Sequence, residues 1–204
     1  MKKQKLLVNF ILDRSGSMET CQTQTISGFN EYLQDLKKNS PDSEFTLTLF
    51  NTEILKLYIK KPIKEVKLLN KDSYNPNGST ALYDAVVETV EKVCEELEDK
   101  DKPKSLVVIM TDGEENSSKE HNEKCLKDLI EKLQKEGNWT FVFLGANQDS
   151  WLNASQWGLA SGNVVNYSVT NTGKAFQGLT ASTMAFADST STSTSNFFKD
   201  KDYA

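Results

Sequence analysis

Asp13, Ser15 and Ser17 stand at alternate positions in the stretch "FILDRSGSM", directly after an apolar run. One carboxylate and two hydroxyls in a glycine-containing turn can do three kinds of work. They can cap a following helix, they can bind a hard metal cation through oxygen, or the carboxylate can act as a nucleophile. The stretch alone does not choose between these roles.

Two later stretches carry polar residues of the same character. Thr80 follows the turn "NPNGS" and precedes an amphipathic segment, and Asp112 follows the apolar run "SLVVIMT" at the start of "DGEEN". Taken singly, Thr80 could be a helix N-cap, and Asp112 with Gly113 could form an ordinary turn. Their meaning depends on whether the fold brings them to Asp13.

The elements around these residues alternate between strand and helix. Continuous apolar runs over 5–12, 105–111 and 139–145 are typical of parallel strands buried on both faces, and the alternating pattern over 41–60 predicts a β-hairpin. Helical periodicity covers 20–38, 80–98, 118–136 and 171–186, and 163–168 predicts a weak edge strand. This order predicts an α/β fold: a doubly wound, Rossmann-like, mostly parallel sheet with one antiparallel edge strand and helices on both faces.

Such a fold brings the polar residues together. Ligands of open α/β sheets bind beyond the carboxyl ends of the strands, where all three stretches lie. We therefore predict one site containing Asp13, Ser15, Ser17, Thr80 and Asp112. Carboxylate and hydroxyl oxygens without imidazole or thiolate favour Mg²⁺, with Mn²⁺ or Ca²⁺ as alternatives.

"DRSGS", "NGSTALYDA" and "MTDGEEN" together resemble the metal-ion-dependent adhesion site of von Willebrand factor type A domains. The family pattern is Asp-x-Ser-x-Ser, then a Thr, then an Asp in a Thr-Asp-Gly turn, here Asp13, Ser15, Ser17, Thr80 and Asp112. The stretch "FVFLGANQDS" is similar to stand-alone intracellular bacterial and phage members. One departure is Ser79, where a glycine commonly precedes the threonine.

The resemblance implies a binding function rather than an enzymatic one. In the family, a carboxylate of a partner protein completes the coordination of the cation. The implied partner is therefore a protein that presents an Asp or Glu side chain. Two alternatives remain open: a Mg²⁺-dependent phosphohydrolase with Asp13 as nucleophile, and a scaffold whose metal site has no function.

Composition and charge argue against several other classes of protein. The net charge of −5 and a sequence pI of about 5.1 argue against nucleic-acid binding, which needs a basic surface. No apolar run approaches the length of a membrane span, and the basic, apolar N-terminus predicts a first strand rather than a signal peptide. Three cysteines without a CxxC pair indicate a reducing compartment, so we expect a cytoplasmic protein. Oligomeric state has no signal in the sequence.

The C-terminal tail, the segment after Asp112 and Arg14 each have more than one possible role. We predict a domain over 1–187 and a disordered Ser/Thr-rich tail over 188–204, in which Phe197, Phe198 and Tyr203 could dock on a partner. Glu114, Glu115 and Asn116 could be solvated, start the helix at 118 or select the partner, and Arg14 could form an ion pair or contact the bound carboxylate.

Overall fold

The computed structural model describes residues 4–98, 102–146 and 154–198. Parts of three predicted features, the N-terminus, the segment 147–150 of "FVFLGANQDS" and Tyr203, lie outside these ranges. The strands are β1 Leu6–Asp13, β2 Glu44–Phe50, β3 Ile54–Pro62, β4 Lys104–Thr111, β5 Trp139–Gly145 and β6 Val164–Asn166. The main helices are α1 Gln22–Asn39, α2 Leu82–Glu96, α3 Glu123–Lys135 and α5 Thr172–Asp188, and a 3₁₀ helix, η1, covers Gly16–Cys21.

The sheet confirms the predicted fold class. Its strand order is β3-β2-β1-β4-β5-β6, and every neighbouring pair is parallel except β2 with β3. The antiparallel strand is thus at one edge, as the hairpin pattern predicts. The predicted weak strand near 164 forms the opposite edge.

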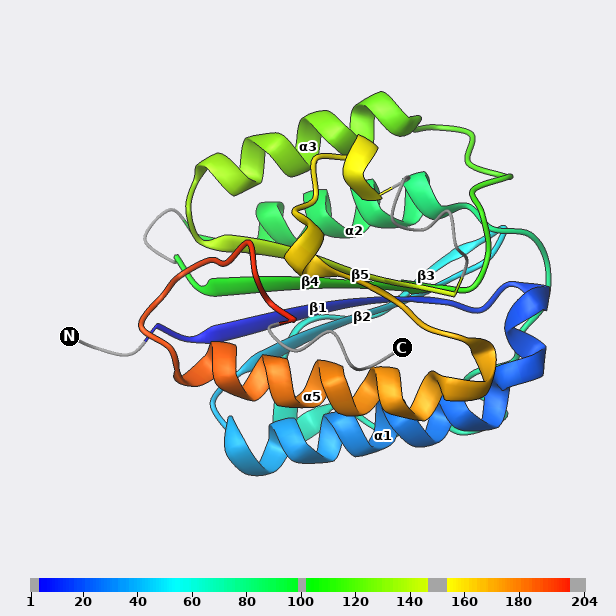
Figure 1. The fold of residues 1–204 in the computed structure, drawn as a ribbon, viewed down its shortest axis with the longest axis horizontal. Coiled ribbons are helices and arrows are strands. Elements are labelled where there is room, and N and C mark those ends of the chain that lie inside the picture. The colour runs from blue at the N-terminus through cyan, green and yellow to red at the C-terminus, as the bar shows by residue number, and fades with distance from the viewer. Residues whose placement is uncertain (1–3, 99–101, 147–153, 199–204) are drawn as a thin grey trace.

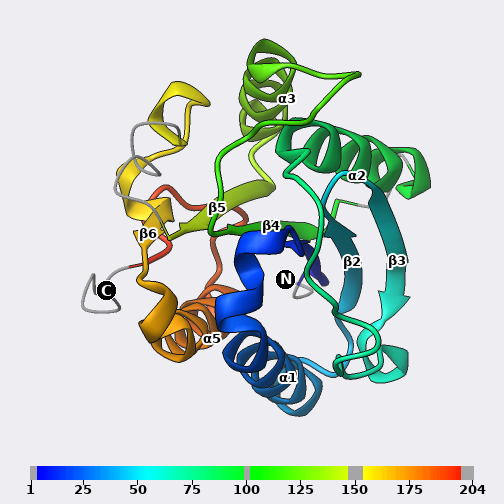
Figure 2. The same cartoon turned by 90° about the vertical axis from the view of Figure 1, so that its right-hand side faces the viewer.

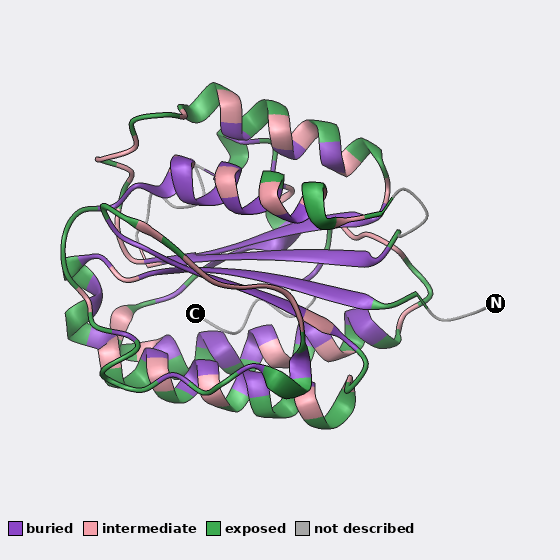
Figure 3. Ribbon diagram, turned by 180° about the vertical axis from the view of Figure 1, so that it is seen from behind, coloured by how far each residue is buried: buried purple, intermediate pink, exposed green. Residues whose placement is uncertain are grey.

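Helices cover both faces of the sheet (Figure 1). Helices α1 and α5 pack on one face around Phe10, Phe29 and Phe176, while α2 and α3 pack on the other. Strands β1, β2, β4 and β5 are buried nearly throughout, the edge strand β3 is only partly buried, and the outer helix faces are exposed (Figure 3). Continuous apolar strands are explained by this double cover, because each strand side faces a hydrophobic layer.

The strand order also locates the ligand-binding edge. After β1 the chain builds β2 and β3 on one side and then returns to build β4 on the other side of β1. The sheet therefore changes direction of winding between β1 and β4, which is where doubly wound sheets bind ligands. Figure 2 looks onto this edge, with η1 in front.

The helix predicted to begin at 118 begins at Glu123 instead. The carboxylate of Asp84 accepts hydrogen bonds from the backbone N–H groups of Lys119, Glu120 and His121. These bonds tie the preceding residues to α2, so they cannot enter a helical hydrogen-bond ladder. Asn122 then caps α3 by accepting a bond from the backbone N–H of Cys125.

Residues 189–198 pack against the domain, where the composition predicts disorder. Phe197 and Phe198 are 4% and 1% exposed and join the core on the α1/α5 face. The side chain of Asn163 donates to the carbonyl oxygen of Thr194 at 2.9 Å and accepts from the backbone N–H of Phe197 at 2.9 Å. The burial of two adjacent phenylalanines and the two hydrogen bonds of Asn163 thus order this segment despite its Ser/Thr-rich composition.

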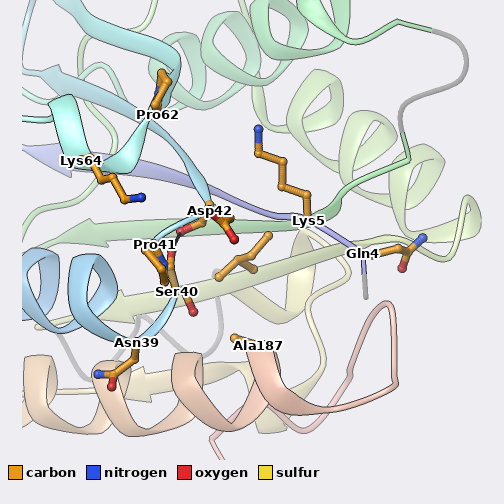
Figure 4. Close-up of a pocket in the computed structure, with 11 residues that line it drawn as sticks. Gln4, Lys5, Asn39, Ser40, Pro41, Asp42, Pro62, Lys64 and Ala187 are labelled. Carbon is orange, nitrogen blue, oxygen red and sulfur yellow. Dashed lines mark hydrogen bonds between the residues drawn. The ribbon is translucent and has the colours of Figure 1, made fainter. Parts of the chain in front are cut away.

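The edge where β1 begins carries a separate pocket of about 720 Å³ (Figure 4). Lys5, Asp42 and Lys64 line it from three separate segments. None of the five predicted site residues takes part, so this pocket is distinct from the predicted site. Within the described ranges, none of the helices combines the length and apolar character needed to cross a bilayer.

Candidate metal centre

Asp13 is the innermost residue of the predicted site. It is the last residue of β1 and is fully buried. Its Oδ1 accepts a hydrogen bond from the backbone N–H of Ser15 at 2.6 Å, and its Oδ2 accepts one from the hydroxyl of Thr111, the last residue of β4, at 2.5 Å. One carboxylate oxygen is therefore oriented by the loop after β1, and the other by the last residue of β4.

Ser17 connects the loop after β1 to the loop after β4. Its hydroxyl donates to Oδ1 of Asp112 at 2.6 Å and lies 3.1 Å from the hydroxyl oxygen of Ser15. Ser15 is buried, whereas Ser17 is exposed. The hydroxyls thus run from the buried Asp13 side of the site toward solvent.

Thr80 reaches the same place from the segment before α2. A Cβ added to Gly113 would lie 3.1 Å from the Thr80 hydroxyl oxygen, 3.6 Å from that of Ser17 and 3.9 Å from Oδ2 of Asp13. One point beside Gly113, in the loop after β4, is therefore within 4 Å of oxygen atoms from the two other segments, the loop after β1 and the segment before α2. The structure brings all five predicted side chains to one edge of the sheet.

Helix capping does not explain these residues. Ser15 precedes η1 without a side-chain capping hydrogen bond, and the N-cap of α2 is Ala81 rather than Thr80. The hydroxyls of Ser15, Ser17 and Thr80 are instead directed to the shared space.

Two buried tyrosines support the strand ends from below. The hydroxyl of Tyr74 donates to the carbonyl oxygen of Asp13 at 2.7 Å, and that of Tyr167 donates to the carbonyl oxygen of Thr111 at 3.4 Å. Sequence reasoning missed both, and also the Thr111 bond to Asp13. Nothing local marks the tyrosines, because their partners are 61 and 56 residues away.

The segment after Asp112 is neither solvated throughout nor the start of a helix. Glu115 is half-buried and accepts hydrogen bonds from the backbone N–H groups of Tyr83, Ser117 and Ser118. Glu114 is exposed. One guanidinium nitrogen of Arg14 lies 4.0 Å from the carboxylate of the exposed Glu53, which is the limit of an ion pair.

Both site carboxyls are held in unfavourable surroundings for negative charge. Burial raises the pKa of Asp13 from 3.8 to about 6, although the bonds from Thr111 and Ser15 act in the opposite direction. Burial also raises the pKa of Asp112, opposed by the Ser17 hydroxyl. Among the residues described, neither carboxylate forms an ion pair with a lysine or arginine. A bound cation would supply the missing positive charge.

The donor set fits a hard divalent cation. In the part of the chain that the structure describes, no group of three or more His, Cys, Asp or Glu side chains is placed to hold a metal ion. A cation at this edge would therefore rely on hydroxyl oxygens together with two carboxylates. Oxygen-only donors of this kind suit Mg²⁺, Mn²⁺ or Ca²⁺.

The raised pKa of Asp13 gives a pH dependence with a definite sign. Between pH 6 and 3.8 the folded metal-free protein keeps a proton on Asp13 that the unfolded chain has lost. When the folded state binds more protons than the unfolded chain, lowering the pH stabilises the folded state. The free energy of unfolding should therefore increase as pH falls through this window. We expect wild type to gain about 1 kcal/mol relative to Asp13→Asn between pH 7 and pH 5.

Urea denaturation in excess chelator at the two pH values measures this difference. The Asp13→Asn variant removes the titrating group and controls for every other carboxyl. An equal pH dependence in both proteins, or a wild type that loses stability toward pH 5 relative to the variant, would contradict the buried and raised carboxyl.

Comparison with solved structures supports the fold. The chain matches proximal thread matrix protein 1 from the mussel byssus with a TM-score of 0.65 and 16% identity, over 90% of this chain and 48% of that one. It matches a manganese-loaded TRAP protein of Plasmodium vivax with a TM-score of 0.59 and 18% identity, over 87% and 74%. The vWF domain of the type V pili tip protein Mfa5 from Porphyromonas gingivalis matches with a TM-score of 0.65 and 9% identity, over 93% and 98%.

These identities are low enough that the structural matches establish the fold alone. The chain spans about half the length of the mussel protein. No curated protein matches it by sequence. Residues 8–182, however, match the sequence pattern of the von Willebrand factor type A domain. That match covers most of the chain, the carboxyl ends of both strands that carry the site and all five predicted site residues, and on this evidence the chain belongs to the von Willebrand factor type A domain family.

Proposed function

We propose that this chain is a metal-dependent protein-recognition module whose adhesion site consists of Asp13, Ser15, Ser17, Thr80 and Asp112. Domains of this family generally mediate metal-dependent protein interactions. The observation that carries the proposal is that oxygen atoms of Asp13, Ser17 and Thr80, from two separate segments, converge beside Gly113 of a third segment. We propose Mg²⁺ as the cation, with Mn²⁺ or Ca²⁺ as substitutes.

Each residue has a distinct part in this proposal. Ser15, Ser17 and Thr80 present hydroxyl oxygens, Asp112 lies near solvent and hydrogen-bonds Ser17, and buried Asp13 supplies negative charge from below. When bound, the divalent cation would supply positive charge and an open coordination position for a carboxylate oxygen. Because the domain contributes only two carboxylates, a third from an Asp or Glu of a partner protein remains favourable.

The phosphohydrolase alternative fits the geometry less well. A nucleophilic aspartate needs an oxygen that can reach the substrate phosphorus. Asp13 has no exposed surface, and both of its oxygens accept hydrogen bonds from Ser15 and Thr111. We therefore propose a binding function and no catalytic step.

The setting of the protein forms part of the proposal. An odd number of cysteines, all three of them free, supports a reducing compartment such as the cytoplasm. The similarity of "FVFLGANQDS" to bacterial and phage members supports a stand-alone protein of that origin. A net charge of −5 supports a protein partner rather than a nucleic acid.

Affinity capture from an extract of the source cell tests this function. We expect at least one protein to be retained by the immobilised chain in Mg²⁺ and released in chelator. The same protein should not be retained by the Asp112→Asn variant in Mg²⁺, which controls for chelator effects on the partner. Retention of an unchanged set of proteins in chelator would contradict the proposal and favour a metal-independent scaffold.

A further inference from the structure

Thr80 has no regular secondary structure of its own to hold it. The residues before it form a turn with Gly78 at a φ of +74°, and α2 begins only at Leu82. Ala81, the N-cap residue, makes no side-chain capping bond. The position of the Thr80 hydroxyl must therefore be set by contacts from elsewhere.

The flanking Ser79 and Ala81 donate backbone bonds to the turn between β2 and β3, whereas the bonds of Thr80 itself are made with the loop that follows β4. The Asn116 side-chain oxygen Oδ1 accepts a hydrogen bond from the backbone N–H of Thr80 at 2.9 Å. In return, the carbonyl oxygen of Thr80 accepts bonds from the backbone N–H groups of Asn116 at 3.0 Å and Ser117 at 3.2 Å. Both backbone polar groups of Thr80 are thus bonded to residues 36 and 37 positions away.

The loop is in turn fastened to the first turn of α2. Glu115 accepts a bond from the backbone N–H of Tyr83 at 3.0 Å, and the Ser118 hydroxyl accepts one from that of Asp84 at 3.1 Å. The Asp84 carboxylate, 6% exposed, binds the backbone of 119–121. These bonds satisfy N–H groups that the N-terminus of a helix leaves free, and they make the loop and the helix start one unit.

We propose that Asn116 is a positioning residue for the cation site and that it holds the Thr80 hydroxyl in register with Asp112. This inference rests on the proposed metal-binding function. Asp112 opens the same loop four positions before Asn116, so one hydrogen-bonded segment carries one site member and fixes another. Outer partners of this kind commonly change metal affinity 10- to 100-fold when removed.

Asn116 is also well suited to a clean test because it is an exposed residue outside the core. Asn70 is a matched control. It is likewise an exposed loop asparagine whose Oδ1 accepts backbone N–H bonds, from Asp72 and Ser73, but it does not touch Thr80. Any general cost of losing an asparagine side chain from a loop should appear in both variants.

The experiment measures the affinity of the full chain for Mn²⁺ by isothermal titration calorimetry, and the melting temperature of the metal-free protein. We expect Asn116→Ala to weaken Mn²⁺ binding by about 10-fold, while its melting temperature changes no more than that of Asn70→Ala. Asn70→Ala should keep wild-type affinity. Asn116→Asp, which retains an acceptor oxygen for the Thr80 N–H, should bind Mn²⁺ at least as tightly as wild type.

A double-mutant cycle separates positioning from general damage. If Asn116 acts through Thr80, adding Asn116→Ala to Thr80→Ala should cause no further loss of affinity. Full additivity, or wild-type affinity in Asn116→Ala while Thr80→Ala binds weakly, would overturn the inference and leave the proposed function standing. Wild-type affinity in both Thr80→Ala and Asp112→Ala would instead overturn the proposed function.

Discussion

Asp13→Asn is expected to stabilise the metal-free protein and at the same time to abolish tight cation binding. The amide can keep the local hydrogen bonds, because its Oδ1 can accept from the Ser15 N–H and its Nδ2 can donate to the Thr111 hydroxyl. It removes a buried charge whose pKa is raised to about 6. We expect the free energy of unfolding in chelator at pH 7 to rise by up to about 3 kcal/mol.

Cation binding should respond in the opposite direction. Loss of the buried negative charge should weaken Mn²⁺ binding by at least about 100-fold, the upper end of the range for outer partners of metal sites. Urea denaturation and titration calorimetry measure the two quantities on the same protein. A variant that is both less stable and only weakly affected in binding would show that Asp13 has a structural role instead.

Phe198→Ala is expected to destabilise the protein and to leave cation binding unchanged. Phe198 is 1% exposed, its ring packs edge-on against that of Phe197 at 4.9 Å between centroids, and its backbone N–H donates to the carbonyl oxygen of Gly162. Removal of a buried phenylalanine side chain costs about 3–5 kcal/mol, a large part of the 5–15 kcal/mol that stabilises a typical domain. Mn²⁺ affinity of the folded fraction should stay at the wild-type value.

Ser195→Ala provides the control for this experiment, because Ser195 is an exposed residue of the same segment. Its free energy of unfolding should stay within about 0.5 kcal/mol of wild type. If the free energy of unfolding of Phe198→Ala also lies within that margin of wild type, the segment 189–198 does not belong to the core. The prediction of a disordered tail would then stand.

The fold could be predicted because its signals are local. Continuous apolar runs such as 105–111 and 139–145 require cover on both faces, and their alternation with amphipathic segments leaves few arrangements other than a doubly wound sheet. The hairpin that contains β2 and β3 likewise shows its period in the sequence. The helix start at Glu123 could not be predicted, because a side chain 39 positions earlier, Asp84, holds the preceding backbone.

The candidate site likewise has residues that the sequence predicts and residues that it does not. Asp13, Ser17 and Asp112 follow from the rule that polar residues at the carboxyl ends of parallel strands share one edge. The groups that orient them cannot be predicted from this rule, because Thr111, Tyr74 and Asn116 act through contacts between distant segments. The packing of residues 189–198 escaped prediction for a related reason: average composition hides two buried phenylalanines in a segment whose backbone is hydrogen-bonded by the distant Asn163.

A crystal of the full chain grown with Mn²⁺ and measured at the manganese absorption edge tests the central claim most directly. We predict an anomalous difference peak beside Gly113, within coordinating distance of the hydroxyl oxygens of Ser15, Ser17 and Thr80. The peak should be missing from crystals of Asp13→Asn. A wild-type map with no peak at this edge, or with its manganese bound only at other residues, would contradict the account.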